Sequence, residues 1–420
     1  MARELLRLAT AGSVDDGKST LVGRLLYDTK SILTDTMDAI EQASRDRGLA
    51  GPDLALLTDG LRAEREQGIT IDVAYRYFAT PSRSFILADT PGHVQYTRNM
   101  VTGASTAELA LILVDARNGV VEQTRRHSAI SALLGVRHIA LVVNKMDLVG
   151  FDRDVFESIR AEFVEYARGH GVVDVVAIPI SALDGDNVVT RSEHTDWYEG
   201  PTLLDHLEAV PVGSEAGLQP FRFPVQYVIR PQGPEHHDHR GYAGRVEAGT
   251  VNVGDEIVIA VSGARTTVVA IDTYDGPLAW AQAGQSVTLR LADDLDISRG
   301  DLLAAAGAAP EVRSDVSATV TILAEQALVP RQRLLLRAGT RTVRALVESI
   351  DSRLDIDTLD AHQDVARLVL NDIGEVRIRL AEPVAFDAYS EVRSTGAFLL
   401  IDGQSGATVA AGMVHRSPAA

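Results

Sequence analysis

Cysteine is absent from this 420-residue chain, and lysine is nearly absent. Without cysteine the chain can form no disulfide, no thiolate metal site and no cysteine nucleophile, and this composition fits a cytoplasmic protein. No apolar run approaches the roughly 18 residues of a membrane-spanning helix, so no membrane partner is expected. The formal net charge of −18 disfavours broad binding to nucleic acid or to anionic membranes, so no nucleic-acid partner is expected either.

Lysine accounts for only three of the 40 basic residues, namely Lys18, Lys30 and Lys145. An ammonium is a compact point charge on a thin stem, whereas the arginine guanidinium is a broad planar fork. A chain that uses arginine almost everywhere else is expected to keep lysine where the guanidinium cannot replace it. Lys18 and Lys145 each lie within a recognisable motif, whereas Lys30 has no evident role.

The pattern of apolar residues divides the chain into an α/β part and an all-β part. Short apolar runs alternate with helical patterns over the first half, at residues 5–9, 85–88, 109–114, 139–143 and 175–180. These runs predict parallel strands buried on both faces, and the alternating residues 71–78 predict a strand at the sheet edge. Beyond residue 211 period-two patterns predominate, interrupted by small residues at 304–310. We therefore predict a doubly wound, mostly parallel domain at 1–212 and two β-barrels at 213–308 and 309–420.

A phosphate-binding loop is predicted between the first strand and the first helix. The segment matches Gly-x-x-x-x-Gly-Lys-Ser and consists of Gly12, Ser13, Val14, Asp15, Asp16, Gly17, Lys18 and Ser19, followed by Thr20. The two glycines permit the tight turns that let backbone amides face phosphate oxygens, and the helix N-terminus adds positive potential. Lys18 is expected to reach the β- and γ-phosphates, and the Ser19 hydroxyl is expected to ligate Mg²⁺.

A second phosphate-contacting segment is predicted where the strand at 85–88 ends. It consists of Asp89, Thr90, Pro91, Gly92 and His93. A carboxylate at the carboxyl end of a strand can hold Mg²⁺ through water, and the Gly92 amide can meet the γ-phosphate. Asp-x-x-Gly is common in plain turns, but its position on the core strand after the phosphate loop favours this function.

Two further turns predict recognition of guanine. Two of the predicted buried strands are each followed by a short polar motif. The strand at 139–143 is followed by Asn144, Lys145, Met146 and Asp147, and the strand at 175–180 by Ser181, Ala182 and Leu183. A fixed carboxylate can accept hydrogen bonds from N1–H and the exocyclic amine of guanine, a donor pair that adenine lacks. The Lys145 stem can lie over the base, and a backbone amide of the second turn can meet guanine O6. The predicted ligand is therefore GTP rather than ATP.

With these motifs in order, the chain resembles the translation-factor superfamily of GTPases, and the resemblance covers essentially its whole length. Residues 64–71, Glu-Arg-Glu-Gln-Gly-Ile-Thr-Ile, resemble switch I of that superfamily, and residues 89–93 resemble switch II. The resemblance implies that the Thr70 hydroxyl ligates Mg²⁺ in the GTP state and that His93 orients the attacking water. His93, Lys18 and Thr70 are then the catalytic residues. The alternative for His93 is a cap at a helix start.

Within the superfamily, the chain resembles the GTPase (large) subunits of bacterial sulfate adenylyltransferase. The likeness rests on Ser-Val-Asp-Asp-Gly-Lys-Ser-Thr at 13–20, where elongation factors usually carry histidine at the position of Asp16, and on residues 71–78, 95–100 and 123–128. It implies an enzyme of sulfate assimilation that couples GTP hydrolysis to formation of adenosine 5′-phosphosulfate and pyrophosphate from ATP and sulfate. A partner small subunit would carry out the adenylyl transfer, in a heterodimer or a larger assembly.

Two other functions remain open from the residues alone. One is a translation elongation-type GTPase that delivers tRNA to the ribosome, which the two barrels, Thr70 and His93 fit equally well. The other is a regulatory switch that binds GTP and a partner. The stretch at His236, His237, Asp238 and His239 is predicted to be a solvated loop, with adventitious Zn²⁺ or Ni²⁺ binding as the alternative.

Overall fold

A computed structural model describes residues 4–32, 54–57, 72–93, 96–169, 172, 174–211, 217–230, 240–355, 360–363 and 365–417, with isolated positions between 35 and 45. The chain forms two compact units, residues 1–212 and 213–420, and each unit is described by itself. Within the ranges given above, no helix is both long enough and apolar enough to cross a membrane.

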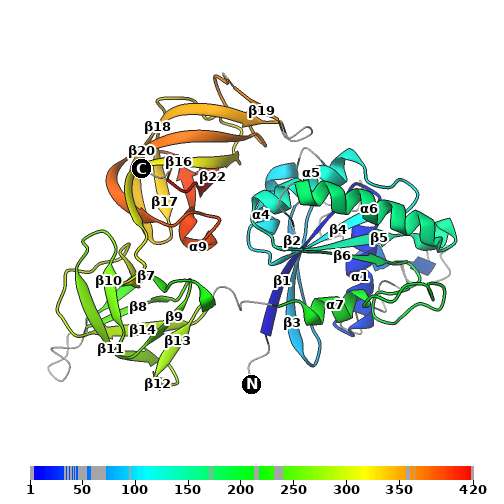
Figure 1. Ribbon diagram of the computed structural model, residues 1–420, viewed down its shortest axis with the longest axis horizontal. Coiled ribbons are helices and arrows are strands. Elements are labelled where there is room, and N and C mark those ends of the chain that lie inside the picture. Colours follow the sequence, from blue (N-terminus) through cyan, green and yellow to red (C-terminus); the bar gives the residue numbers. More distant parts are fainter. Residues whose placement is uncertain are drawn as a thin grey trace. The chain divides into compact units, whose positions relative to one another are not determined.

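A six-stranded sheet in the order β2-β3-β1-β4-β5-β6 forms the centre of the first unit (Figure 1). The strands are β1 (Glu4–Ala11), β2 (Ala74–Ala79), β3 (Arg83–Asp89), β4 (Leu109–Asp115), β5 (His138–Asn144) and β6 (Asp174–Pro179). The edge strand β2 runs antiparallel to β3, and the other pairs are parallel. Every residue of β4 is buried, as expected for a parallel strand covered on both faces. The predicted doubly wound, mostly parallel sheet is therefore confirmed.

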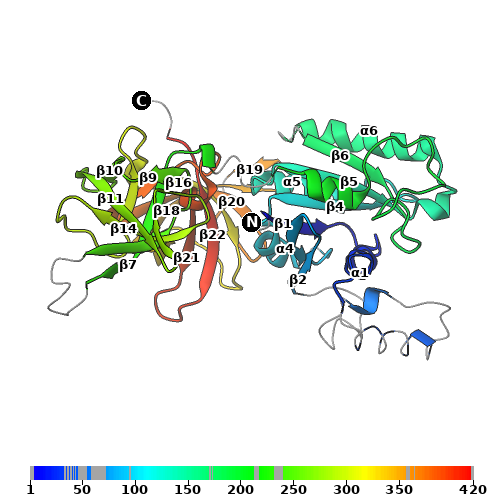
Figure 2. The same ribbon diagram turned by 90° about the horizontal axis from the view of Figure 1, so that it is seen from below.

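Helices cover both faces of this sheet, and Figure 2 shows α6 and α1 on opposite sides. The helices are α1 (Lys18–Asp28), α4 (Thr97–Ala104), α5 (Glu122–Leu133), α6 (Arg153–Gly169) and α7 (Leu203–Ala209), with 3₁₀ turns η1 (Leu54–Leu57) and η3 (Met146–Val149). In α6 the buried residues Phe156, Ile159, Phe163 and Ala167 recur at helical spacing and form the stripe that packs on the sheet. Because β1, β3, β4 and β5 are parallel, their carboxyl ends meet at one edge of the sheet.

Two antiparallel barrels form the second unit. The first contains β7 (Arg222–Ile229), β8 (Gly241–Arg245), β10 (Glu256–Ile259), β11 (Arg265–Thr273), β14 (Ser286–Leu291) and β15 (Leu302–Ala305). Pairing of β10 with β11 closes the ring, and β12 (Gly276–Leu278) extends it beside β11. Strands β9 (Thr250–Asn252) and β13 (Trp280–Gln282) pair with each other. The barrel encloses its own core, which includes Phe223, Tyr242 and Leu289.

The second barrel follows after a short connection. It contains β16 (Glu311–Ile322), β17 (Arg333–Ala338), β18 (Arg341–Leu354), β20 (Ile373–Phe386), β21 (Ala397–Ile401) and β22 (Thr408–Val414), with β19 (Ala361–His362) beside β18. Pairing of β17 with β18 closes this ring, and the short helix α9 (Arg393–Gly396) precedes β21. A separate core that includes Leu336, Ile378 and Phe386 fills it. The prediction of two β-barrels after the α/β domain is confirmed.

A buried ion pair joins the two barrels. Arg222 on β7 donates from Nε and Nη2 to the two carboxylate oxygens of Asp387, each over 2.8 Å. The Thr395 hydroxyl on α9 donates to the same carboxylate over 2.5 Å. All three residues are buried, so loss of either charged partner would leave the other uncompensated in the interior. The pair therefore fixes α9 against β7.

Candidate nucleotide-binding site

The phosphate loop connects β1 to α1 through three residues with positive φ. Gly12 has a φ of 154°, Asp15 of 68° and Gly17 of 90°. Gly17 is the N-cap of α1, and a Cβ there would lie 2.3 Å from Nδ2 of Asn144. Glycine is thus required at position 17 both by the backbone conformation and by the close approach of Asn144.

Lys18 lies inside this loop and is 7% exposed. Its ammonium donates to the backbone oxygens of Gly12, over 3.0 Å, and Ser13, over 2.7 Å. Burial lowers the pKa of Lys18, although the nearby carboxylates of Asp89 and Asp16 oppose the shift. A slender ammonium can make both contacts at once, which agrees with the retention of lysine at this position.

Asp16 braces the loop from within. Its Oδ2 accepts a hydrogen bond from the Ser13 amide over 2.5 Å, and burial raises the pKa of its carboxyl group. The Ser13 hydroxyl donates in turn to Oε1 of Gln123 on α5, over 2.7 Å. Asp16, where elongation factors usually carry histidine, thus stabilises the conformation of the phosphate loop. Sequence reasoning missed Gln123, whose position across the fold no local pattern reveals.

The turn after β3 lies directly against the phosphate loop. The Thr10 hydroxyl donates to Oδ1 of the buried Asp89 over 2.8 Å and accepts from the Thr90 amide over 3.3 Å. A Cβ at Gly92 would lie 2.6 Å from both Nζ of Lys18 and the Gly12 oxygen. His93 is half-buried, with its ring 6.1 Å from that of Tyr96. Residues 89–93 therefore meet residues 12–18, as their sequence positions predict.

Asn144 connects the phosphate loop to the turn after β6. Its Nδ2 donates to the Asp16 oxygen over 2.8 Å, and its Oδ1 accepts from the Ala182 amide over 2.9 Å. Ser181 is buried, whereas 67% of Leu183 is exposed beside this turn. The Met146 amide donates to the Ile180 oxygen over 3.1 Å, which ties the two turns together a second time. The two predicted base-recognition turns are therefore adjacent, with Asp147 partly exposed beside them.

Lys145 adopts a left-handed backbone, with a φ of 62°, and its ammonium bridges two segments. It lies 2.9 Å from Oδ2 of Asp115 at the end of β4 and also donates to the Asp15 oxygen. Arg117 contacts the same carboxylate through Nη2 over 2.6 Å. Burial alone would raise the pKa of Asp115, but hydrogen bonds from Arg117 and Lys145 hold it well below its usual range.

Sequence reasoning missed Asp115, although one signal could have found it. Like Asp89 and Asn144, Asp115 is a polar residue at the end of a buried apolar strand. Thr70, residues 64–71 as a whole and the stretch from His236 to His239 lie outside the described residues. Lys30 is exposed, has a φ of 54° and lies two residues beyond the end of α1, and its position assigns it no part in the site.

A Gly-x-x-x-x-Gly-Lys-Ser loop, an Asp-x-x-Gly turn and the two turns predicted to recognise the base lie on one sheet, and two barrels follow. These features are those of a GTPase of the elongation factor Tu class. Residues 3–212 match the elongation factor Tu GTP binding domain. Residues 242–304 match elongation factor Tu domain 2, and residues 315–415 match the GTP-eEF1A C-terminal domain-like family. GTP is therefore the nucleotide substrate of this class of domain.

Curated relatives narrow this class. The bifunctional enzyme CysN/CysC of Mycobacterium tuberculosis is 55% identical over 99% of this chain and 68% of its own length. Sulfate adenylyltransferase subunit 1 of Cellvibrio japonicus is 51% identical over 98% of this chain and 87% of its own length. The corresponding subunit of Aeromonas salmonicida is 50% identical over 100% and 88%. The chain belongs to the family of sulfate adenylyltransferase subunit 1.

Proposed function

We propose that this chain is the GTP-hydrolysing subunit of sulfate adenylyltransferase (ATP sulfurylase) in sulfate assimilation. It couples GTP hydrolysis to the formation of adenosine 5′-phosphosulfate and pyrophosphate from ATP and sulfate on a partner small subunit. The observation that carries the proposal is the identity of 50–51% to sulfate adenylyltransferase subunits 1 over 98–100% of the chain. The cytoplasm is the proposed location, which the lack of cysteine supports.

The phosphate contacts follow from the loop geometry. Lys18 now donates to two backbone oxygens of its own loop, and in the complex it redirects these hydrogen bonds to the β- and γ-phosphates. Backbone amides of residues 13–20 and of Gly92 surround the same phosphates, with the N-terminus of α1 behind them. Because Lys18 is buried, its charge acts in a medium of low dielectric constant and stabilises the charge that develops on the leaving diphosphate.

The residues near the phosphate loop fit a magnesium ion. Mg²⁺ is commonly held by one or two protein oxygens together with phosphate oxygens and waters, so it needs no cage of carboxylates. The Ser19 hydroxyl and Asp89, through water, supply such a donor set, and Thr10 fixes the Asp89 carboxylate. Thr70 is the proposed third oxygen. The ion would neutralise charge on the β- and γ-phosphates during transfer.

His93 is proposed to position the attacking water. It follows Gly92, which lies against the phosphate loop, so its ring can reach the space beyond the γ-phosphate. Orienting a water requires a hydrogen-bonding side chain at this point rather than a strong base. The His93→Gln variant should keep part of the turnover, because an amide can also orient water, whereas His93→Ala should lose most of it at unchanged GTP affinity.

Guanine recognition is assigned to Asp147, Lys145 and the turn after β6. The Asp147 carboxylate accepts from N1–H and the exocyclic amine, while the Lys145 stem and the exposed Leu183 cover the two faces of the base. The Ala182 amide is already bonded to Asn144, so the Leu183 amide is the proposed donor to O6. Asp147→Asn should transfer the preference from GTP to xanthosine triphosphate, which carries an oxygen in place of the amine.

Reconstitution tests the proposal. GTP turnover by the full chain should rise when the small subunit, ATP and sulfate are all present, and adenosine 5′-phosphosulfate should accumulate only while GTP is hydrolysed. In the Asp147→Asn variant, accumulation should depend on xanthosine triphosphate instead, which excludes a contaminating GTPase. Stimulation by ribosomes and tRNA, with no response to the small subunit, would establish the elongation-factor alternative, which the relatives do not favour.

A further inference from the structure

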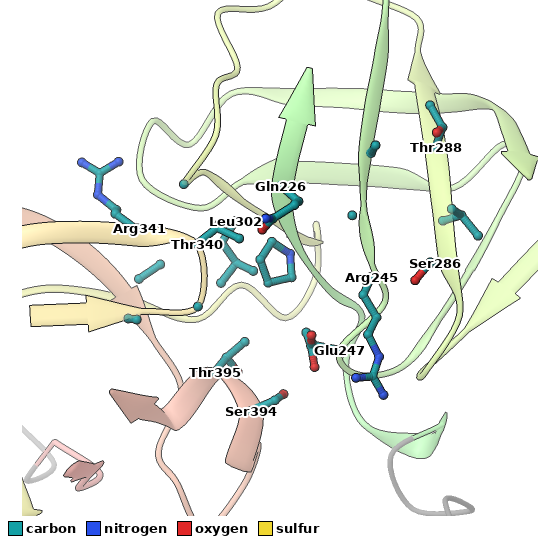
Figure 3. A pocket seen from close by; sticks show the side chains of 18 of the residues that line it. Gln226, Arg245, Glu247, Ser286, Thr288, Leu302, Thr340, Arg341, Ser394 and Thr395 are labelled. Carbon is teal, nitrogen blue, oxygen red and sulfur yellow. The ribbon is translucent and has the colours of Figure 1, made fainter. Parts of the chain in front are cut away.

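A cleft of 830 Å³ lies between the two barrels of the second unit, and the proposed function does not use it (Figure 3). One wall is the outer face of the first barrel, formed by β7, β8 and β14, and the other is the β17–β18 turn with α9. Cavities of about 300–1,000 Å³ at domain interfaces are typical of small-molecule sites. Both the size and the position of the cleft therefore suit a small ligand.

The walls of this cleft are fixed before any ligand arrives. Thr395, which lines the cleft, donates to Asp387, and Asp387 is held by the buried Arg222 of the opposite barrel. On the β17–β18 turn, Arg341 donates to Glu382 over 3.0 Å. A ligand would thus pay little ordering entropy for the walls, which favours binding in a preformed pocket.

Two opposite charges face this cleft and have no partner among the residues that the structure describes. Val246 is fully buried in the barrel core, so its neighbours Arg245 and Glu247 extend from the outer face, and both line the cleft. Figure 3 shows Glu247 between Arg245 and the side chains of α9. Within the described part of the chain, neither side chain makes an ion pair or a hydrogen bond. By contrast, Arg290 on β14 of the same barrel is paired with Asp272 over 2.8 Å.

Three hydroxyl groups lie around the two charges. Ser286 lies opposite Arg245 on β14, Thr288 follows on the same face, and Ser394 projects from α9. These side chains likewise make no hydrogen bond to other described residues. Each can donate or accept, so they complement a ligand of either polarity. The ligand class is therefore decided by the two charges.

We propose that this cleft binds a small zwitterion of the α-amino acid class, with its carboxylate at Arg245 and its ammonium at Glu247. Arg245 is the last residue of β8, and Glu247 follows two positions further along the chain. Residues two apart in an extended chain lie about 6.6 Å apart, a gap that a molecule with adjacent opposite charges can bridge. A simple anion would leave Glu247 unpaired and would be repelled by it, and a simple cation would meet the same problem at Arg245. The site is independent of GTP turnover, so it stands or falls separately from the proposed function.

Calorimetric titration of the full chain with the 20 common L-amino acids tests this site. At least one should bind with a Kd below about 1 mM, and its amide and N-acetyl derivatives, which each lack one charge, should bind at least about 10-fold more weakly. Arg245→Gln and Glu247→Gln should each weaken binding by a similar factor. Arg265→Gln, an exposed arginine of the same barrel away from the cleft, should leave it unchanged, and GTP affinity should be the same in all three variants.

Three results would overturn the assignment. Failure of all 20 amino acids to bind at millimolar concentration is the first. The second is equal amino-acid affinity in the Arg245→Gln, Glu247→Gln and Arg265→Gln variants, because the two cleft charges would then make no contribution to binding. The third is loss of small-subunit assembly in the two cleft variants without any amino-acid binding in the wild type, which would make the cleft a protein-docking surface instead.

Discussion

The nucleotide-binding site and the barrel cleft differ in how their polar side chains are partnered. Around the phosphate loop, Lys18 and Asp16 form hydrogen bonds within the loop, and Asn144 donates to it from the end of β5. In the cleft, Arg245 and Glu247 have no such partners among the described residues. In the nucleotide-binding site, the residues that hold the site in shape are thus also those proposed to contact the ligand. In the cleft, the Arg222–Asp387 ion pair supports the walls, and the proposed ligand contacts are made by other residues.

This difference implies different responses to substitution. A residue that both shapes a site and contacts its ligand cannot be changed without affecting both, so conservative substitutions in the nucleotide site should be severe. In the cleft, the charged groups and the supporting ion pair are separate residues. Ligand affinity and stability of the barrels should therefore be separable there by mutation.

The largest effect is expected from Lys18→Arg. The guanidinium keeps the charge, but it is too broad for the buried position from which the ammonium reaches two backbone oxygens. We expect GTP affinity to fall about 10³-fold, or roughly 4 kcal/mol, because two charge-assisted hydrogen bonds to phosphate are lost. Fluorescence titration with a labelled GTP analogue measures this loss.

Lys30→Arg is the matched control for this substitution. Lys30 is exposed beyond the end of α1, so the same chemical change there should alter GTP affinity by less than about twofold. Equal affinities of the Lys18→Arg variant and the wild type would remove the argument that scarce lysines mark sites where arginine cannot serve.

The next effect concerns the ion pair that supports the cleft. Asp387→Asn leaves the Arg222 guanidinium buried without its counter-charge, and we expect the second unit to lose about 3–4 kcal/mol of unfolding free energy. Trp280 reports on this unit alone once Trp197 is replaced by Phe, since the chain has two tryptophans. Denaturant titration of this variant gives the free energy.

An exposed pair of the same unit supplies the comparison. Arg379 and Asp315 also form an ion pair, but both side chains are largely exposed. Asp315→Asn should change stability by at most about 1 kcal/mol. If Asp387→Asn were equally mild, the barrels would be held together by apolar packing rather than by this pair, and the preformed cleft would lose its support.

The two sites also differ in how far the amino-acid sequence predicts them. The phosphate loop and the base-recognition turns are local patterns, each a few residues long at the end of an apolar strand, so they were predictable together with the sheet that carries them. Asp115 and Gln123 act through contacts between segments distant in the chain, which single motifs do not encode. The cleft is even less predictable from the sequence, because Arg245 and Ser394 face it only after the two barrels have folded and packed.

The smallest effect is a pH dependence confined to the first unit. His127 on α5 is buried, and its desolvation, with the charges of Lys18 and Arg126 nearby, lowers its pKa to about 3. In the unfolded chain its pKa is about 6.5, so the unfolded state binds the proton first as the pH falls. The stabilisation is therefore fully present above pH 6.5 and is lost progressively between pH 6.5 and 3.

His127→Gln, which cannot be protonated, isolates this contribution. Between pH 7.5 and 5.5 the first unit of the wild type should lose about 1.4 kcal/mol more unfolding free energy than the variant does. Trp197 fluorescence in a Trp280→Phe background follows that unit, since the chain has two tryptophans. Parallel slopes for the wild type and His127→Gln would mean that α5 admits water beside the phosphate loop, and the nucleotide site would then be less rigid than its hydrogen bonds imply.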